Sequence, residues 1–232
     1  QEECVDYLFN EYKIDYRELD ITRETYLMKA IKEKKENLVD YFIRKKVNVN
    51  LENDESQTPL GAAIEGKNEK IVELLLEGGV DTNKPTSKGI KEYYPISLAI
   101  KENEENIYFK LLKYGAKIQK KDTRGNMAVH YAAKKGKYHL LNNLLQKTTK
   151  HINEENEKGE SPLYLVVKKG HLNCAKLLLA TFQCKPEGYT KEPLEVAVKE
   201  NKKDMENLLK QHGATLNRKK SWFSMFQSIH DF

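Results

Sequence analysis

Cysteine and histidine are the residues of this chain best suited to nucleophilic or metal chemistry, and their spacing favours neither. The cysteines are Cys4, Cys174 and Cys184. An odd and sparse set of this kind favours a reducing compartment over a disulfide scaffold. No Cys/His pair has zinc-finger spacing, so we predict no metal site. Each cysteine is expected to pack as a small apolar side chain, with a catalytic thiol as the minor alternative.

The sequence also lacks the patterns that would indicate other catalytic or nucleotide-binding sites. It contains no His-Glu-x-x-His helix, no complete Gly-x-x-x-x-Gly-Lys-Ser/Thr loop and no Gly-x-Gly-x-x-Gly. A Gly-x-Ser-x-Gly nucleophile elbow is absent too. The carboxylates are expected to lie on exposed helix faces. The sequence therefore predicts a protein with no catalytic residues, no cofactor and no small-molecule substrate.

One short pattern recurs six times along the chain at nearly constant spacing. It consists of Pro or an equivalent residue, an aliphatic residue, and Ala or Val three positions after the aliphatic one. Its first residues are Tyr26, Pro59, Pro95, Ala128, Pro162 and Pro193, separated by 33, 36, 33, 34 and 31 residues. A period of this length is typical of proteins built from stacked repeats.

Each copy predicts two short helices that would bring equivalent positions into register. Pro falls in the first turn of the first helix, where its missing N–H has no partner to lose. The second helix carries an apolar stripe at i, i+3 and i+4, as in Ile71, Leu74 and Leu75. The glycines expected to end second helices in the left-handed conformation are Gly79, Gly115 and Gly213.

These motifs resemble the ankyrin repeat. The T-P-L-H-x-A box of that family appears as T-P-L-G-A-A at 58–63 and as M-A-V-H-Y-A at 127–132, and its G-A-D-V-N exit is echoed by G-V-D-T-N at 79–83. The resemblance implies an all-α solenoid of helix–turn–helix repeats with protruding turns or hairpins. It also implies a concave face that binds a protein partner, a local hydrogen-bonding role for His130, and no catalytic residues.

The resemblance also suggests how the chain is organised. A partial N-terminal capping repeat is expected at 1–19, six repeats at 20–217, and an amphipathic capping helix or tail at 218–232. The expected repeats are approximately 20–52, 53–85, 86–121, 122–155, 156–186 and 187–217. The chain begins with Gln1 instead of Met, so we expect a fragment or a processed product.

Two positions just after each T-P-L-H-x-A box (the Ala box), the second and third residues beyond its last position, are expected to face the groove of such a solenoid. The first is occupied by Lys32, Glu65, Lys101, Lys134, Lys168 and Lys199, and the second by Glu33, Gly66, Glu102, Lys135, Lys169 and Glu200. The predicted partner-binding lysines are Lys101, Lys134, Lys135, Lys168, Lys169 and Lys199. Aligned across repeats, they would form a groove for an acidic peptide. The alternative is a solvated, Lys-rich helix surface.

The third repeat carries about three extra residues before its proline. Gly89 precedes Pro95 by six residues, whereas the equivalent glycines of the next two repeats precede their anchors by three. Tyrosines in such an extended finger are favoured contact residues. The candidate partner-binding residues of this region and the next turn are Ile90, Tyr93, Tyr94 and Arg124. The alternative is a tolerated insertion whose tyrosines pack on the neighbouring turns.

The C-terminal segment has apolar residues at helical spacing. The residues predicted to cap the solenoid or to dock elsewhere are Trp222, Phe223, Met225, Phe226 and Ile229. The first interpretation is a helix that covers the apolar flank of the last repeat. The second is an amphipathic segment, preceded by the basic residues 218–220, that lies on an anionic membrane or in a partner groove.

The overall charge is nearly balanced, with 40 basic and 35 acidic residues and a net charge of +5. Only five basic residues are arginines, and lysine makes single contacts where arginine makes forked ones, so nucleic acid is not an expected partner. No apolar run approaches the ~20 residues that span a bilayer. We expect a monomeric, cytoplasmic protein that binds another protein. The alternatives are the targeting domain of a larger bacterial effector or enzyme acting in the host cytosol, and a membrane-associated scaffold.

Overall fold

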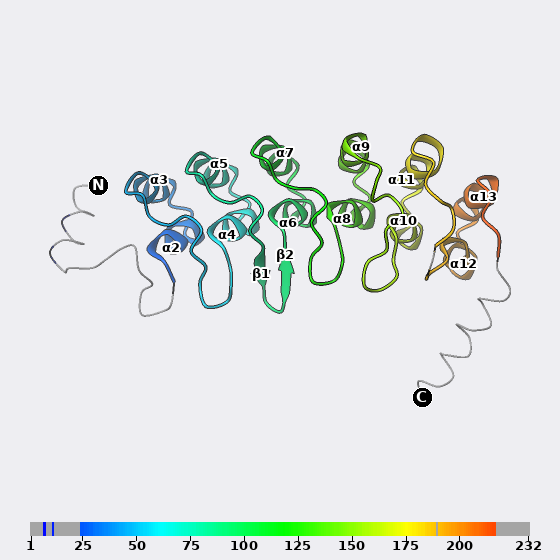
Figure 1. Cartoon of the computed structure of the whole chain (residues 1–232), viewed down its shortest axis with the longest axis horizontal. Helices are drawn as coiled ribbons and strands as arrows, with labels where there is room; N and C mark the ends of the chain where they lie inside the picture. Colours follow the sequence, from blue (N-terminus) through cyan, green and yellow to red (C-terminus); the bar gives the residue numbers. More distant parts are fainter. Residues whose placement is uncertain (1–6, 8–10, 12–23, 189, 217–232) are drawn as a thin grey trace, which may run out of the picture. The chain divides into compact units, whose positions relative to one another are not determined.

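The computed structural model describes Tyr7, Glu11, residues 24–188 and residues 190–216 (Figure 1). Of the predicted N-terminal repeat at 1–19, only Tyr7 and Glu11 are described. Asn217 and the predicted C-terminal segment 218–232 lie outside the described residues, and with them Trp222, Phe223, Met225, Phe226 and Ile229. The described residues form short helices in successive pairs and one β-hairpin. The predicted all-α repeat fold is therefore confirmed, with two short strands added to it.

The helices alternate between first and second members of each pair. The first helices are α2 (Tyr26–Lys32), α4 (Pro59–Glu65), α6 (Pro95–Glu102), α8 (Ala128–Lys135), α10 (Pro162–Lys169) and α12 (Pro193–Lys199). The second helices are α3 (Glu36–Arg44), α5 (Glu69–Glu77), α7 (Glu105–Lys113), α9 (Tyr138–Lys147), α11 (Leu172–Lys176) and α13 (Lys203–Gln211). A π-helical turn, η1 (Leu177–Thr181), follows α11.

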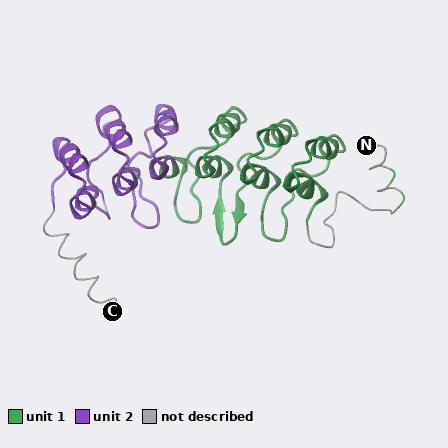
Figure 2. Cartoon of the chain, turned by 180° about the vertical axis from the view of Figure 1, so that it is seen from behind, with its two compact units in different colours: residues 1–131 green, residues 132–232 purple. Residues whose placement is uncertain are grey.

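The chain divides into two compact units, unit 1 (residues 1–131) and unit 2 (residues 132–232), with the division inside α8 (Figure 2). In unit 1 the first helices α2, α4 and α6 pack side by side, and the second helices α3, α5 and α7 form a parallel row. In unit 2, α10 packs on α12, and α11 contacts both α9 and α13. Each unit thus has two layers of helices with turns at the open side of the first layer.

Local sequence rules explain where the first helices begin. The Thr58 hydroxyl accepts a hydrogen bond from Gly61 N at 3.0 Å, and the Ser161 hydroxyl accepts one from Tyr164 N at 3.1 Å. Proline follows each of these caps, in the first turn of α4 and of α10. A capping hydroxyl contributes about 1 kcal/mol, and proline at this position costs no hydrogen bond.

Left-handed glycines end the second helices as the sequence predicts. Gly79, Gly115 and Gly213 have φ angles of 80°, 84° and 91°. This conformation has almost no steric cost for glycine. It lets the chain leave each second helix and return towards the next turn.

The apolar core lies between the two layers and between neighbouring repeats. Residues 59–64 of α4 and 95–100 of α6 are all buried, because these helices are covered on several sides. The second helices bury one face only, as α5 does with Ile71, Val72 and Leu75. Burying one such side chain stabilises the fold by about 1.5–3 kcal/mol. One repeat alone would leave much of this surface in water, so stacking is required.

The turns that precede α4, α8 and α10 are each shaped by one buried polar side chain. Asn53 Oδ1 accepts hydrogen bonds from Glu55 N and Gln57 N. Asp122 and Asn156 hold the next turns of this type by the same pattern of two backbone N–H groups on one side-chain oxygen. These side chains replace the backbone partners that a regular element would supply.

The extra residues of the third repeat form the β-hairpin. Strands β1 (Thr86–Lys88) and β2 (Lys91–Tyr93) are antiparallel, with Thr86 opposite Tyr93 and Lys88 opposite Lys91. Gly89, with a φ of 60°, and Ile90 form the two-residue connection. The hairpin hangs on the same side of α4 and α6 as the other turns of unit 1 (Figure 1).

Candidate partner-binding surface

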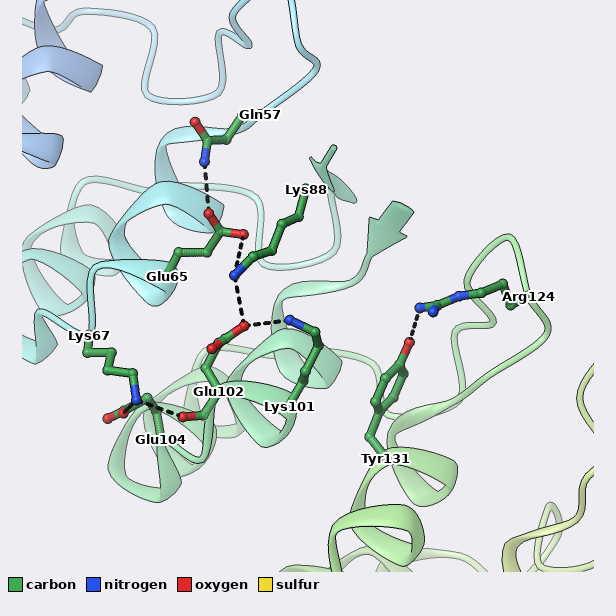
Figure 3. A network of polar contacts seen from close by, with 9 residues as sticks. All are labelled: Gln57, Glu65, Lys67, Lys88, Lys101, Glu102, Glu104, Arg124 and Tyr131. Atoms are coloured by element: carbon green, nitrogen blue, oxygen red, sulfur yellow. Dashed lines mark hydrogen bonds and ion pairs between the residues drawn. The ribbon is translucent and has the colours of Figure 1, made fainter. Parts of the chain in front are cut away.

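A lysine of the hairpin links it to two first helices. Lys88 Nζ lies 3.5 Å from Glu65 Oε1 of α4 and 3.0 Å from Glu102 Oε1 of α6 (Figure 3). Lys101 Nζ approaches the same Glu102 oxygen at 2.6 Å, and Gln57 Nε2 donates to Glu65 Oε2 at 3.1 Å. Burial alone would raise the pKa of Glu102, but the hydrogen bonds from Lys101 and Lys88 lower it overall.

The base of the hairpin is attached through buried backbone and hydroxyl groups. Thr86 is 1% exposed, and its hydroxyl accepts a hydrogen bond from Thr58 N at 3.0 Å. Ser87 N donates to Ser56 O at 2.9 Å. A Cβ atom on Gly61 would lie 2.6 Å from Thr86 Cβ, so glycine at this box position makes room for the hairpin.

Two of the predicted contact residues form a cluster inside unit 1. The Tyr93 ring is only 3% exposed and lies 6.0 Å from the Tyr131 ring, measured between centroids. Lys101 Nζ and Arg124 Cζ lie 4.9 and 5.0 Å from the centre of the Tyr93 ring. Arg124 also donates to the Tyr131 hydroxyl at 2.6 Å and pairs with Asp122. Tyr93 and Arg124 therefore serve to hold the hairpin against the next turn, and Tyr93 offers a partner little surface.

The other two predicted finger residues differ in exposure. Ile90, at the hairpin tip, is 100% exposed. Tyr94 is half-buried directly before α6, with Lys120 Nζ 5.9 Å from its ring centre. Ile90 is therefore the one large apolar side chain of the hairpin that is entirely in solvent.

The predicted lysines do not form one uniform group. Lys101 is half-buried and paired with Glu102 in unit 1. The unit 2 lysines are exposed at the C-terminal ends of first helices, Lys134 and Lys135 on α8, Lys168 and Lys169 on α10, and Lys199 on α12. Lys168 Nζ lies 3.0 Å from Glu160 Oε1. We call the five unit 2 residues Lys134, Lys135, Lys168, Lys169 and Lys199 the lysine surface.

The expectation that carboxylates lie on exposed helix faces is wrong for the residues that matter most here. The side chains of Asp122, Glu160, Glu65 and Glu102 are 0%, 10%, 18% and 19% exposed. Each has a cationic neighbour, which offsets the cost of burying its charge. No role for Lys88 or Gln57, the partners of Glu65, was predicted from the sequence. The sequence does contain an indication of this pairing. Glu65 is an acid where the other five repeats carry Lys, and it is followed by an insertion that contains Lys88.

The described residues hold no group of three or more His, Cys, Asp or Glu side chains placed to bind a metal ion. Cys174 and Cys184 are buried free thiols, and burial raises the pKa of both, that of Cys184 to about 12. A protonated, inaccessible thiol is a poor nucleophile. His130 accepts a hydrogen bond from Met127 N at 3.2 Å, the local role expected for it. Across the described ranges, no helix has the length and apolar character needed to cross a membrane.

The paired short helices, with side-chain-capped turns and a hairpin beside the first helices, define a helical-repeat protein. The family model described as "Ankyrin repeats (3 copies)" matches residues 1–86, 27–122 and 129–220. The chain therefore belongs to the ankyrin-repeat family, whose repeats are a protein–protein interaction module.

The curated relatives include proteins of different kinds. Phosphocholine transferase AnkX of Legionella pneumophila is 33% identical over 112 residues, which are 47% of this chain and 12% of that protein. The nuclear factor NF-kappa-B p105 subunit of Gallus gallus is 31% identical over 135 residues, 56% of this chain and 14% of that protein. Human transient receptor potential cation channel subfamily A member 1 is 28% identical over 170 residues, 70% of this chain and 15% of that channel. The chain thus matches only about an eighth to a seventh of the length of these relatives, in each case 15% or less.

Two solved structures support the fold. The ankyrin repeat domain of human ASB11 is similar with a TM-score of 0.71 and 26% identity, covering 84% of this chain and 86% of that one. An ankyrin repeat domain from Acinetobacter baumannii AYE gives a TM-score of 0.72 at 21% identity, over 82% of this chain and 98% of that one. The second likeness concerns the fold alone.

Proposed function

We propose that this protein recognises a partner protein through the turns and first helices of unit 1, with Ile90 as the apolar anchor. The observation that carries the proposal is the combination of complete exposure at Ile90 with attachment of the hairpin on both strands. Lys88 holds β1 to α4 and α6, and Tyr93 holds β2 to the following turn. No catalytic step is part of this function.

The attachment matters for binding because ordering a loop opposes association. A preorganised hairpin loses little conformational entropy when a partner covers it. An isoleucine that passes from full exposure into a partner pocket contributes about 1.5–3 kcal/mol. This is the size expected of an anchor residue in a protein–protein interface. Lys91 is exposed beside the tip and would favour a pocket with an acidic rim.

The test is quantitative affinity capture with three forms of the protein: wild type, Ile90→Asp and Phe109→Asp. Phe109 is 44% exposed on the second helix α7, so its substitution is a control of matched chemistry on another surface. We expect the Ile90 variant to lose a partner that wild type and the Phe109 variant both retain, and to unfold at the same temperature as wild type. A partner that binds the Ile90 variant normally, or that both variants lose equally, would contradict the proposal.

A second candidate function is recognition on behalf of a longer protein. Its support is the match to the phosphocholine transferase AnkX, of which the chain matches 12% of the length. In this view the chain is the targeting part of an effector or enzyme, working in the cytoplasm of its own or a host cell. Reading the full coding sequence on both sides of this segment tests it directly. A catalytic domain in the same frame would support it, and its absence would refute it.

A further inference from the structure

Charge is distributed unequally between the two units. Residues 1–131 contain 22 basic and 24 acidic residues, a net charge of −2, whereas residues 132–232 contain 18 basic and 11 acidic residues, a net charge of +7. The overall +5 is therefore the sum of a nearly neutral unit 1 and a basic unit 2. Such an asymmetry affects which partners each unit attracts.

The same asymmetry appears at equivalent repeat positions. The two positions after the Ala box hold Lys32, Glu33, Glu65, Gly66, Lys101 and Glu102 in unit 1, which sum to −1. In unit 2 they hold Lys134, Lys135, Lys168, Lys169, Lys199 and Glu200, which sum to +4. A general excess of lysine on solvated helices would not single out one unit at one set of positions.

Hydrogen bonds between repeats keep the helix ends of the lysine surface together. His171 Nε2 lies 3.2 Å from Lys134 O, at the end of α8. Lys202 Nζ donates to Val167 O at 2.8 Å and to Lys168 O at 2.6 Å, at the end of α10. His171 follows α10 and binds the carbonyl end of α8. Lys202 follows α12 and binds the carbonyl end of α10. The C-terminal ends of α8, α10 and α12 are thereby aligned, and their lysines with them.

The acidic residues beside the lysine surface are already neutralised. Glu160 accepts from Lys168, and Glu200 lies 2.6 Å from Lys202. Within the described ranges, no carboxylate lies at ion-pair distance from Lys135, Lys169 or Lys199. Three cations thus face solvent with no such partner, in a row of aligned helix ends.

We propose that the lysine surface of unit 2 binds an acidic segment of a protein partner. This inference rests on the proposed protein-recognition function, adds a second contact surface in unit 2, and names the chemical class of the segment bound there. Several glutamates or aspartates spaced along an extended chain would satisfy the lysines of successive repeats. Long-range attraction would raise the association rate, and binding would weaken as salt screens the charges.

The composition of the surface favours a carboxylate ligand over nucleic acid. Unit 2 has no arginine among its described residues, so it has no forked donor for phosphates or base edges. Tyr164, the aromatic residue between the Lys168 and Lys191 ammonium groups, is only 7% exposed and gives bases no stacking platform. Single ammonium contacts are sufficient for carboxylates.

The experiment compares a basic-to-acidic triple variant with a matched control. The test variant is Lys135→Glu, Lys169→Glu and Lys199→Glu, which leaves the Lys168–Glu160 pair intact. The control is Lys147→Glu, Lys150→Glu and Lys176→Glu, three exposed lysines of unit 2 on and after second helices. Both variants change the net charge equally. The probes are a fluorescein-labelled peptide of about ten glutamates and a labelled oligothymidylate of similar charge, titrated at low and at physiological salt.

We expect wild type to bind the acidic peptide, the test variant to bind it at least about tenfold more weakly, and the control to stay within about twofold of wild type. Equal losses in both variants would show attraction to net charge alone and would overturn the proposal. So would tighter binding of the oligothymidylate, or no peptide binding at low salt. Ile90→Asp is predicted to bind the acidic peptide as tightly as wild type. Peptide titration therefore tests the lysine surface separately from the proposed anchor at Ile90.

Discussion

Lys88 Nζ on the hairpin lies 3.0 Å from Glu102 Oε1 on α6, across a separation of 14 residues in sequence. The same ammonium reaches Glu65 on α4. The insertion therefore carries a cation that lies at ion-pair distance from acids on two neighbouring first helices. The hairpin and Glu65, which stands where the other five repeats carry Lys, are therefore linked through Lys88.

Replacing Lys88 with Met should loosen the hairpin without unfolding the repeats. Lys88→Met removes both ion pairs but keeps the apolar stem, and because the lysine is 43% exposed the loss should be only about 0.5 kcal/mol. The larger effect should be faster amide hydrogen exchange at Ser87, whose N–H donates to Ser56 O. Burial alone would lower the pKa of Lys88, but Glu102 and Glu65 raise it overall, so the ion pairs persist at every pH where both carboxylates are charged.

Lys91→Met is the control for this prediction. Lys91 lies opposite Lys88 in the hairpin and is exposed. Its replacement should leave hydrogen exchange in the hairpin unchanged. Equal acceleration in both variants would mean that the ion pairs of Lys88 do not hold the hairpin.

Glu160 should make the stability of unit 2 depend on pH in the acidic range. Burial alone would raise its pKa, but hydrogen bonds from Lys168 and Asn156 lower it overall. A carboxylate with a lowered folded-state pKa stabilises the fold above its unfolded pKa of about 4.3, and this contribution is lost as the pH falls through the folded pKa. Glu160→Gln should therefore be less stable than wild type by about 1 kcal/mol at pH 7.

The difference between wild type and Glu160→Gln should shrink towards zero as the pH falls below about 4. Urea denaturation at a series of pH values measures it. Glu157→Gln changes an exposed residue of the same turn and should remain close to wild type throughout. A gap for Glu160→Gln that stays constant with pH would show that the charge is not responsible.

The elements of this fold were predictable where the determinants are local. Thr58 as a cap, proline at the start of α4 and Gly79 at a left-handed helix end each depend on residues a few positions apart. The repeat period then specifies which elements are neighbours. Sequence alone therefore predicts the ankyrin fold and the extended third turn.

The surface was less predictable because its determinants are distant in sequence. Glu65 and Lys88 are 23 residues apart, and only the hairpin geometry brings them together. Tyr93 was expected in a partner contact, yet the alternation of side chains in β2 directs it towards Tyr131 and Arg124. Whether a finger residue faces inward depends on strand register, which the spacing of Gly89 and Pro95 does not reveal.

Two glycines at equivalent repeat positions should respond differently to alanine. Gly136 and Gly170 follow α8 and α10 with φ angles of 66° and 77°. Alanine at either position adopts a left-handed conformation, which costs about 1 kcal/mol. At Gly136 the new Cβ would also lie 2.5 Å from His171 Nδ1, whereas at Gly170 the nearest atom is Lys202 Cε at 3.8 Å.

Gly136→Ala should therefore lower the free energy of unfolding by at least about twice as much as Gly170→Ala, because a packed ring must move. Equilibrium urea unfolding of the two variants checks this. Adding His171→Ala to Gly136→Ala should recover part of the loss. Identical effects at the two glycines would show that backbone strain alone matters and that the ring moves freely.

Asn83 should be required for stacking the second and third helix pairs of unit 1. Its Oδ1 accepts a hydrogen bond from Lys117 N at 2.7 Å, and its Nδ2 lies 3.2 Å from Gly115 O. Asn50 makes the equivalent bond to Asp81 N at 2.8 Å, one repeat earlier.

Asn83→Ala leaves a backbone N–H and a C=O without this partner, which should cost about 1–2 kcal/mol. Asn83→Asp keeps the acceptor and loses the donor, so it should retain roughly half of that stability. Urea unfolding ranks the three proteins, and an alanine variant as stable as the aspartate variant would show that water replaces Asn83 at Lys117 N without loss.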